Sequence, residues 1–410
     1  MSFFYTTAIY LYYLIVFILS AFNSKAKLWI KGRKDLFRQL RKSVEKDENI
    51  IWFHASSLGE FEQGRPLIEA LKKEDPEQKI LLTFFSPSGF EVRKNYDGAD
   101  YIHYLPLDTK KNAKRFVKIV NPKAAIFIKY EFWYHFLKQL KKNESSVILV
   151  SGIFRQDQMF FRKIGVWYRK LLFYFDHFFV QDQNSAELLK GISLKNITVA
   201  GDTRFDRVNR IAGESAGNTI VSEFTQGKFT FVCGSTWERD EEILISFLEK
   251  TREDCRVIIA PHEISISQIG ALTTRLEPDA LLYSKANPEN ISDKKVMIID
   301  NIGMLSMLYK YGDVAYIGGG FGSGIHNILE AAVYGIPVVF GPNYQKFREA
   351  HEILKAGGGF SVSNAVELNK VFNELIRNKE KLKFASKQAD NYIQKNLGAT
   401  DIIMNYLKMI

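Results

Sequence analysis

The chain has 410 residues, of which 46% are hydrophobic and 25% are charged, and its formal net charge is +10. This composition is typical of a folded globular protein and excludes a disordered or fibrous chain. At about 150 residues per domain, the length predicts two or three domains. The positive charge could indicate a nucleic-acid-binding protein. However, residues 1–45 hold eight basic and only two acidic side chains, so the rest of the chain is close to neutral.

The N-terminal stretch is apolar. Residues 2–24 contain no Lys, Arg, Asp or Glu, and residues 8–22 are almost wholly aliphatic or aromatic. Roughly 20 helical residues span the hydrocarbon layer of a bilayer, so we expect a transmembrane anchor over 1–24. A basic juxtamembrane segment follows over 25–48, and the positive-inside rule places it in the cytoplasm. The alternative is a buried core helix.

Cysteine and histidine usage argues against a disulfide or a metal centre. Cys233 and Cys255 both lie within runs typical of β-strands, so we expect buried, reduced thiols. The seven histidines show no spacing typical of metal ligands, and no Asp-x-Asp pair occurs. The sequence therefore favours metal-independent chemistry and predicts no cofactor.

Beyond residue 48, short apolar runs alternate with amphipathic stretches, which indicates parallel α/β sheets. The first half has predicted strands over 50–54, 80–84, 101–105, 125–128, 147–150 and 178–181, and helices over 61–73, 110–120 and 132–142. The pattern restarts after a polar stretch, with strands over 230–233, 257–259, 296–299, 314–317 and 337–340. We predict two doubly wound, Rossmann-like domains, 49–205 and 206–410, with a last helix that can pack back on the first domain.

The first loop after a strand combines small residues with an acidic helix start, from His54 through Ser56, Ser57 and Gly59 to Glu60. Small residues let a ligand approach the backbone at a helix N-terminus. The Glu60 carboxylate could act there as a general base. The alternative is a glutamate that only complements the helix dipole.

A glycine-rich loop in the second half is a candidate phosphate site. Gly318 to Gly324 follow a predicted strand, and a helix is expected to open at about Ile325. Amides such as those of Gly319 and Gly320 could cradle a phosphate. The spacing matches neither a P-loop nor a dinucleotide fingerprint, and a structural turn is the alternative.

Three further pairs of residues stand near predicted strand ends in this half. Asn327 and Glu330 are three residues apart and would share a helix face, where a carboxylate could accept hydrogen bonds from ribose hydroxyls. Two more loops would open into the cleft expected between the two domains. Their residues are Ser235, Thr236, Pro261 and His262.

Residues 155–179 interleave basic and aromatic side chains. One interpretation is an amphipathic core helix with a solvated basic edge. The other is a membrane-facing patch that admits a lipid substrate and meets its phosphates. Single-strand nucleic-acid binders share the pattern, but the neighbouring apolar N-terminus favours the lipid.

Five segments together resemble the 3-deoxy-D-manno-octulosonic acid (Kdo) transferase family of Gram-negative bacteria. They are HASSLGE at 54–60, KYEFW at 129–133, GDTRFD at 201–206, GST at 234–236 and GIHNILEAAVYGIPVVFGP at 324–342. The resemblance covers nearly the whole chain. It implies an inverting glycosyltransferase of the GT-B fold at the inner membrane, with its domains facing the cytoplasm. CMP-Kdo would be the donor and a lipid A precursor the acceptor, with no cofactor and no nucleic acid.

The resemblance also assigns residues. Glu60 would be the general base, and Glu131 and Arg155 would belong to the acceptor side together with Ser56 and Ser57. The expected CMP contacts are Pro261, His262, Ile302, Gly303, Met304, Asn327, Ile328, Leu329 and Glu330. The chain departs from the family at the donor loop, because residues 261–264 read Pro-His-Glu-Ile and lack the usual arginines on either side.

Two other functions fit the same sequence features. One is a GT-B transferase that uses a UDP-sugar on another membrane lipid. The other is a catalytically silent, membrane-anchored scaffold, which the presence of Glu60, Asn327 and Glu330 disfavours.

Overall fold

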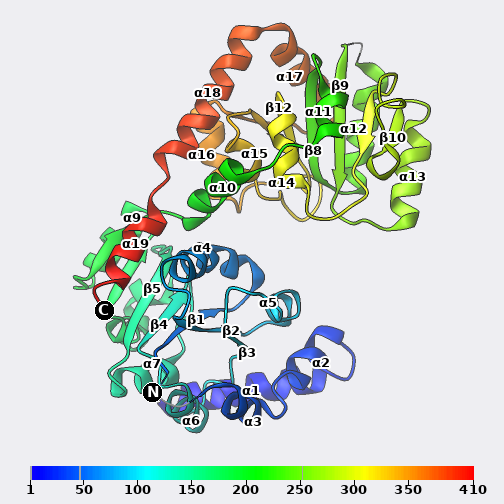
Figure 1. Cartoon of the computed structure of the whole chain (residues 1–410). Coiled ribbons are helices and arrows are strands. Elements are labelled where there is room, and N and C mark those ends of the chain that lie inside the picture. Colours follow the sequence, from blue (N-terminus) through cyan, green and yellow to red (C-terminus); the bar gives the residue numbers. More distant parts are fainter. Residues whose placement is uncertain (1, 46–47, 252) are drawn as a thin grey trace. The chain divides into compact units, whose positions relative to one another are not determined.

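The computed structural model describes residues 2–45, 48–251 and 253–410 and divides into two compact units (Figure 1). Unit 1 runs to Asp206 and also includes Leu397–Ile410, whereas unit 2 spans Arg207–Asn396. Each unit is built on a seven-stranded parallel sheet. The prediction of two parallel α/β domains is therefore confirmed.

The sheet of unit 1 has the strand order β3-β2-β1-β4-β5-β6-β7. Its strands are β1 Ile50–Ala55, β2 Lys79–Phe84, β3 Tyr101–Tyr104, β4 Ala124–Ile128, β5 Ser146–Gly152, β6 His177–Val180 and β7 Ile197–Val199. The helices after residue 48 are α4 Leu58–Glu74, α5 Pro87–Arg93, α6 Lys110–Val120, α7 Tyr134–Lys142, α9 Gln183–Lys190 and α19 Ala399–Leu407. The helix α10, Thr203–Glu214, carries the chain into unit 2.

Both faces of this sheet are buried, as the near-continuous apolar strands require. Alternate residues of β1 point to opposite faces, so Trp52 belongs to one core cluster and Phe53 to the other. Helix α19 adds Ile403 and Met404 to the second cluster. The carboxylate of Asp206 fixes the start of that helix, because it accepts hydrogen bonds from the backbone amides of Gly398 and Thr400.

The sheet of unit 2 has the order β10-β11-β9-β8-β12-β13-β14. Its strands are β8 Phe229–Thr236, β9 Cys255–Pro261, β10 Ala280–Leu282, β11 Val296–Ile298, β12 Val314–Ile317, β13 Val338–Phe340 and β14 Gly359–Ser361. The helices are α11 Thr219–Thr225, α12 Glu238–Lys250, α13 Ile266–Leu276, α14 Leu305–Leu308, α15 Leu329–Ala332, α16 Arg348–Ala356, α17 Ala365–Arg377 and α18 Lys379–Lys395.

Two local features of unit 2 bear on the predictions. Cys233 and Cys255 are buried free thiols, as predicted, and burial raises the pKa of both. The prediction that a helix begins at about Ile325 is wrong. The chain first closes a turn in which the His326 amide donates to the Gly318 carbonyl, and α15 begins only at Leu329.

The apolar N-terminus forms α1, Ser2–Leu19, which is followed by α2, Ser24–Lys31, and α3, Leu36–Ser43. The sequence predicted a transmembrane anchor over 1–24, whereas no helix within residues 2–45, 48–251 and 253–410 is both long and apolar enough to cross a membrane. The helix ends at Leu19, and four tyrosines and two threonines interrupt its apolar run. Residue 1 of that prediction and residues 46–47 of the predicted basic segment lie outside the described residues.

Helix α1 lies along unit 1 and is fixed to it by polar contacts (Figure 1). The Tyr5 hydroxyl donates to the buried carboxylate of Asp108 at 2.6 Å, and Thr6 Oγ1 lies 2.8 Å from His135 Nε2. Asp108 also accepts the backbone amides of His135 and Phe136 at the start of α7. Burial raises the pKa of Asp108 to about 6, although these hydrogen bonds oppose the rise.

Most of α1 outside these contacts is open to solvent. The exposed apolar side chains of the helix, here called the α1 ridge, are Phe3, Phe4, Tyr10, Leu11, Leu14, Ile15, Phe17, Ile18 and Leu19.

The interleaved segment 155–179 is not the amphipathic helix that one interpretation expected. It forms short turns instead, namely η1 Met159–Phe161, η2 Lys163–Gly165, α8 Val166–Arg169 and η3 Leu172–Tyr174. Phe160 and Phe175 enter the core, whereas Ile164, Trp167 and Phe173 remain exposed. The segment therefore adds a second exposed apolar surface to unit 1.

Candidate active site

Two carboxylates approach each other at the carboxyl edge of the first sheet. Strands β1 and β4 are neighbours, with His54 paired in register with Phe127, so the loops that follow them are adjacent. Helix α4 starts after β1 with Ser57 as its N-cap, and the Ser57 amide donates to Glu60 Oε2 at 3.0 Å. Glu60 is half-buried. It therefore caps the helix and still presents a carboxylate to a largely enclosed site.

The second carboxylate, Glu131, is buried in the loop after β4. Lys129, at the start of this loop, has a left-handed backbone conformation (φ 63°), and Glu131 follows it by two residues. Glu131 Oε2 lies 3.0 Å from His54 Nε2 and accepts the Trp133 indole N–H at 2.5 Å. The Ser56 hydroxyl also donates to Glu131.

The two glutamates have opposite pKa shifts. Burial raises the pKa of Glu60, the negative charge of Glu131 raises it further, and the charge of His54 opposes both. Burial also disfavours ionisation of Glu131, but hydrogen bonds from His54, Ser56 and Trp133 and the charge of His54 outweigh it and lower the pKa. A carboxylate whose pKa is raised by a neighbouring carboxylate is suited to accept a proton near neutral pH.

Two basic residues lie near this edge of the sheet. Arg155 is largely exposed and contacts the Tyr130 hydroxyl at 3.4 Å and the Asp157 carboxylate at 3.9 Å. Arg204 binds the buried Asp202 carboxylate through Nε and Nη2 at 3.0 and 2.8 Å. The GDTRFD motif therefore builds a buried ion pair, and Gln63 of α4 donates to the same Asp202 carboxylate.

The glycine-rich loop of unit 2 is held from below by Asp240. This fully buried carboxylate accepts the Gly319 amide at 2.8 Å, the Trp237 amide at 3.0 Å and the Tyr316 hydroxyl at 2.8 Å. The Gly319 amide is thus already engaged, contrary to the expectation that it is free for a phosphate. Gly320 packs against Gly341, because a Cβ at Gly320 would lie 2.6 Å from the Gly341 nitrogen.

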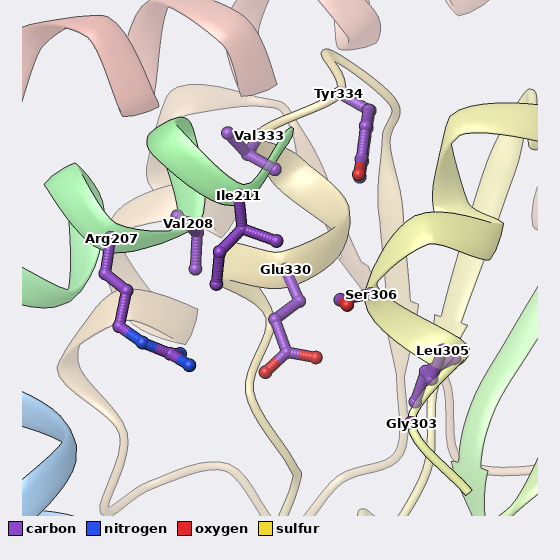
Figure 2. A pocket seen from close by; sticks show the side chains of 9 residues that line it. All are labelled: Arg207, Val208, Ile211, Gly303, Leu305, Ser306, Glu330, Val333 and Tyr334. Atoms are coloured by element: carbon purple, nitrogen blue, oxygen red, sulfur yellow. The ribbon is translucent and has the colours of Figure 1, made fainter. Parts of the chain in front are cut away.

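A cavity of about 190 Å³ lies within unit 2 (Figure 2). The Glu330 carboxylate points into it, and Ser306 and Arg207 flank this carboxylate in the view. Asn327 donates to Glu330 Oε1 at 3.0 Å, but it precedes α15, so the two residues do not share a helix face as predicted. The complete lining is Arg207, Val208, Ile211, Gly303, Leu305, Ser306, Glu330, Val333 and Tyr334.

The remaining predicted donor residues differ in what they can offer a ligand. Ile302 is 90% exposed, Gly303 has a positive φ of 95°, and Met304 precedes α14. Ile328 and Leu329 are fully buried, so only their backbone could contact a nucleotide.

Three rings stack next to the glycine-rich loop. His262 lies 4.5 Å from Trp237 and 4.4 Å from His326 between ring centroids, and the Trp237 indole N–H donates to His326 Nε2 at 2.8 Å. Burial and the nearby His262 lower the pKa of His326 to about 4, so His326 is neutral at physiological pH. Ser235 and Thr236 end β8 beside this stack, and Pro261 ends β9.

Several functional positions were missed from the sequence. His54 was read only as part of a loop, although a polar ring at the end of an apolar strand is a signal for a buried hydrogen-bond network. Asp240 looked like one of several helix-start acids, and Trp237 and His326 had no signal. Within the described ranges, no group of three or more His, Cys, Asp and Glu is placed to hold a metal ion.

Comparisons with known proteins identify relatives of this chain. A family model for "3-Deoxy-D-manno-octulosonic-acid transferase (kdotransferase)" matches residues 31–207. A 3-deoxy-D-manno-octulosonic acid transferase of Aquifex aeolicus is 30% identical over 356 residues, which cover 85% of this chain and 92% of the relative. A 3-deoxy-D-manno-octulosonic acid transferase of Rickettsia bellii is 24% identical over 416 residues, which cover 98% of this chain and 96% of the relative.

Among solved structures, the UDP-GlcNAc 2-epimerase of Neisseria meningitidis bound to UDP-GlcNAc is similar with a TM-score of 0.60 at 15% identity. The similarity covers 88% of this chain and 100% of that chain. At this identity the likeness shows a shared fold.

Asp240→Asn should destabilise unit 2, because an amide cannot accept all three hydrogen bonds that the carboxylate receives. We expect the free energy of unfolding to fall by about 2 kcal/mol, which corresponds to a loss of roughly 4–8 °C in Tm. Calorimetry or thermal circular dichroism measures this loss. Glu238→Gln, an exposed change on the same helical turn, is the control and should leave Tm unchanged.

Proposed function

The chain belongs to the family of 3-deoxy-D-manno-octulosonic acid transferases, and we propose that it transfers Kdo from CMP-Kdo to a lipid A precursor with inversion at the anomeric carbon. Glycosyl transfer with inversion needs a base for the acceptor hydroxyl and a site for the departing nucleotide. The observation that carries the proposal is the half-buried Glu60 carboxylate, whose pKa is raised next to Glu131.

In this mechanism Glu60 removes the proton of an acceptor hydroxyl. The hydroxyl oxygen then forms a bond to the anomeric carbon of Kdo, and the bond from that carbon to the phosphate oxygen breaks. Its electron pair leaves with CMP. Attack from the face opposite the phosphate gives inversion, and the raised pKa makes Glu60 a stronger base than an exposed glutamate.

The donor side of the proposal rests on the cavity around Glu330. Its carboxylate, oriented by Asn327, can accept hydrogen bonds from the two ribose hydroxyls of CMP. The exposed backbone at Ile302 and Gly303 can approach a base closely. We propose that His262 and the turn from Gly318 to His326 contact the phosphate and the sugar.

Glu60→Gln should abolish transfer and leave nucleotide binding intact, since it removes the base and lies outside the unit 2 cavity. We expect kcat to fall by about 10²–10⁴-fold, which is the usual contribution of a general base. Transfer is measured by mass spectrometry of the product from CMP-Kdo and a tetra-acylated lipid A precursor, and CMP affinity by calorimetry.

The exposed Glu77→Gln serves as the matched control for the Glu60 variant. A fully active Glu60→Gln enzyme would falsify the assignment of the base. A wild-type protein that turns over no sugar nucleotide would instead favour the silent scaffold.

The donor is distinguished from a UDP-sugar by competition. We expect CMP to raise the Tm of the wild-type protein and to inhibit transfer, whereas UDP should do neither at the same concentration. Glu330→Gln should weaken CMP binding about tenfold, because a neutral amide is a poorer acceptor for two hydroxyls. Protection by UDP but not by CMP would support the alternative transferase.

The proposed acceptor is a lipid, and unit 1 offers surfaces for its membrane. The α1 ridge and the exposed Ile164, Trp167 and Phe173 are apolar, and Arg162, Lys163 and Lys170 are exposed among them. Apolar side chains edged by basic ones favour the interface of an anionic bilayer. We place the protein at the cytoplasmic face of the inner membrane on this ground.

Vesicle flotation tests the surface. The wild-type protein should float with vesicles that contain anionic lipid, and the double change Leu11→Glu and Ile15→Glu should reduce the bound fraction at least tenfold, because two charges enter the apolar contact. Val366→Glu, a similar change on an exposed residue of unit 2, should bind like wild type. Equal flotation of all three proteins would contradict the membrane contact.

A further inference from the structure

A buried chain of hydrogen bonds runs from β2 to Glu131 through His54. Thr83 Oγ1 accepts the Trp52 indole N–H at 2.8 Å and lies 2.8 Å from His54 Nδ1. The other ring nitrogen, Nε2, lies 3.0 Å from Glu131 Oε2. His54 and Thr83 are fully buried and Glu131 nearly so, so every proton in this chain needs an acceptor within the protein.

The positions of two protons follow from these contacts. His54 Nδ1 also lies 3.1 Å from the Thr83 carbonyl oxygen, which can only accept, so Nδ1 carries a hydrogen. On the other side, the Glu131 oxygen and His54 Nε2 are both acceptors when unprotonated and would repel each other at 3.0 Å. The single N–H of Trp133 lies 2.5 Å from the Glu131 oxygen and 3.1 Å from His54 Nε2, so the carboxylate engages most of it and the two acceptors still face each other. A second proton must therefore lie between Glu131 and His54.

This second proton fixes the charge of the pair. If it sits on Nε2, an imidazolium faces a carboxylate; if it sits on Oε2, a neutral imidazole faces a carboxylic acid. The summed charge of His54 and Glu131 is zero in both cases.

We propose that His54 is a positioning residue of the transfer reaction, which cancels the charge of Glu131 by sharing one proton with it and so keeps Glu60 available as a base. The proposal rests on Glu60 being the base of the proposed function.

The groups that face Glu60 fit this role. Glu131, in the loop after β4, acts on it as a like charge, and His54, on β1, acts as the opposite charge. The charge of Glu131 also acts on Tyr168 of α8. Burial and this charge raise the pKa of Tyr168, so Tyr168 stays neutral. Without His54, an ionised Glu131 would act on Glu60 unopposed, and proton removal from the acceptor would be confined to higher pH.

The test is the acid limb of the pH profile of kcat, measured with saturating CMP-Kdo and lipid acceptor. Transfer falls as the pH drops through the pKa of Glu60, because only the ionised carboxylate accepts a proton. His54→Gln leaves the Glu131 charge uncancelled and should move the acid limb to higher pH by about one unit or more. Glu131→Gln removes the like charge and should move it to lower pH.

The double variant, His54→Gln with Glu131→Gln, should return the acid limb to within a few tenths of a unit of wild type. Thr83→Val is the structural control, because it removes a buried hydroxyl while the Thr83 carbonyl still accepts from His54. It should lower Tm and leave the acid limb in place.

The outcomes separate this inference from the proposed function. A wild-type protein without transfer activity refutes the function itself. An active wild type whose acid limb stays fixed in both single variants, with only kcat lowered at every pH, shows a structural His54 and refutes the inference. If His54→Gln does not fold, Glu131→Gln decides alone, because its acid limb must move to lower pH.

Discussion

The carboxylates of Glu60 and Glu131 lie close together at the carboxyl edge of the unit 1 sheet, and neighbouring residues of unit 1 reduce the repulsion between them. Coulomb repulsion between like charges grows as water is excluded, so Glu60 and Glu131 cannot both ionise there without compensation. The fold supplies it from the sheet itself. His54 stands on β1, next to the strand that leads to Glu131, and its far nitrogen is fixed by Thr83 on β2. The order β2-β1-β4 in the sheet therefore sets the order of the hydrogen bonds.

Unit 2 also has a buried carboxylate next to the carboxyl edge of its sheet. The glycine-rich loop rests on Asp240, whose carboxylate accepts the Gly319 amide. Asp240 accepts hydrogen bonds from Gly319, Trp237 and Tyr316, and these contacts fix the conformation of the glycine-rich loop. Rigid backbone at the edge of a sheet favours selective binding, because less conformational entropy is lost when the ligand arrives. The glycines here serve the close packing of Gly320 on Gly341 as much as any ligand.

The sequence predicted the long elements well because their patterns are strong. Helix α6 was placed at its observed bounds, and the eleven predicted strands all exist within one to three residues at each end. The strands β7, β10 and β14 were missed; each has three residues and lies at the edge of its sheet. The transmembrane prediction counted charges alone and left out the tyrosine and threonine hydroxyls that contact Asp108 and His135.

The residues of the candidate site that belong to a sequence motif could be predicted. The residues whose role depends on tertiary contacts could not. Glu60 was singled out at a helix start after a strand, Glu330 by its spacing from Asn327, and Glu131 only by the resemblance to the family. No local pattern could show that His54 and Glu131, 77 residues apart, share a proton, or that Asp240 reaches Gly319. Such pairs depend on the register of strands distant in sequence, which hydrophobic periodicity does not determine.

The location of α19 has a consequence for how the protein is made. Ile403, Met404 and Leu407 belong to the core of unit 1, but they follow unit 2 in the chain and are synthesised after it. Their place in that core stays empty while all of unit 2 is synthesised, at roughly 5–20 residues per second. Unit 1 is thus complete only after unit 2 has been made. A nascent chain stalled within unit 2 would carry an N-terminal half with an unfilled core, which makes it a substrate for chaperones and proteases.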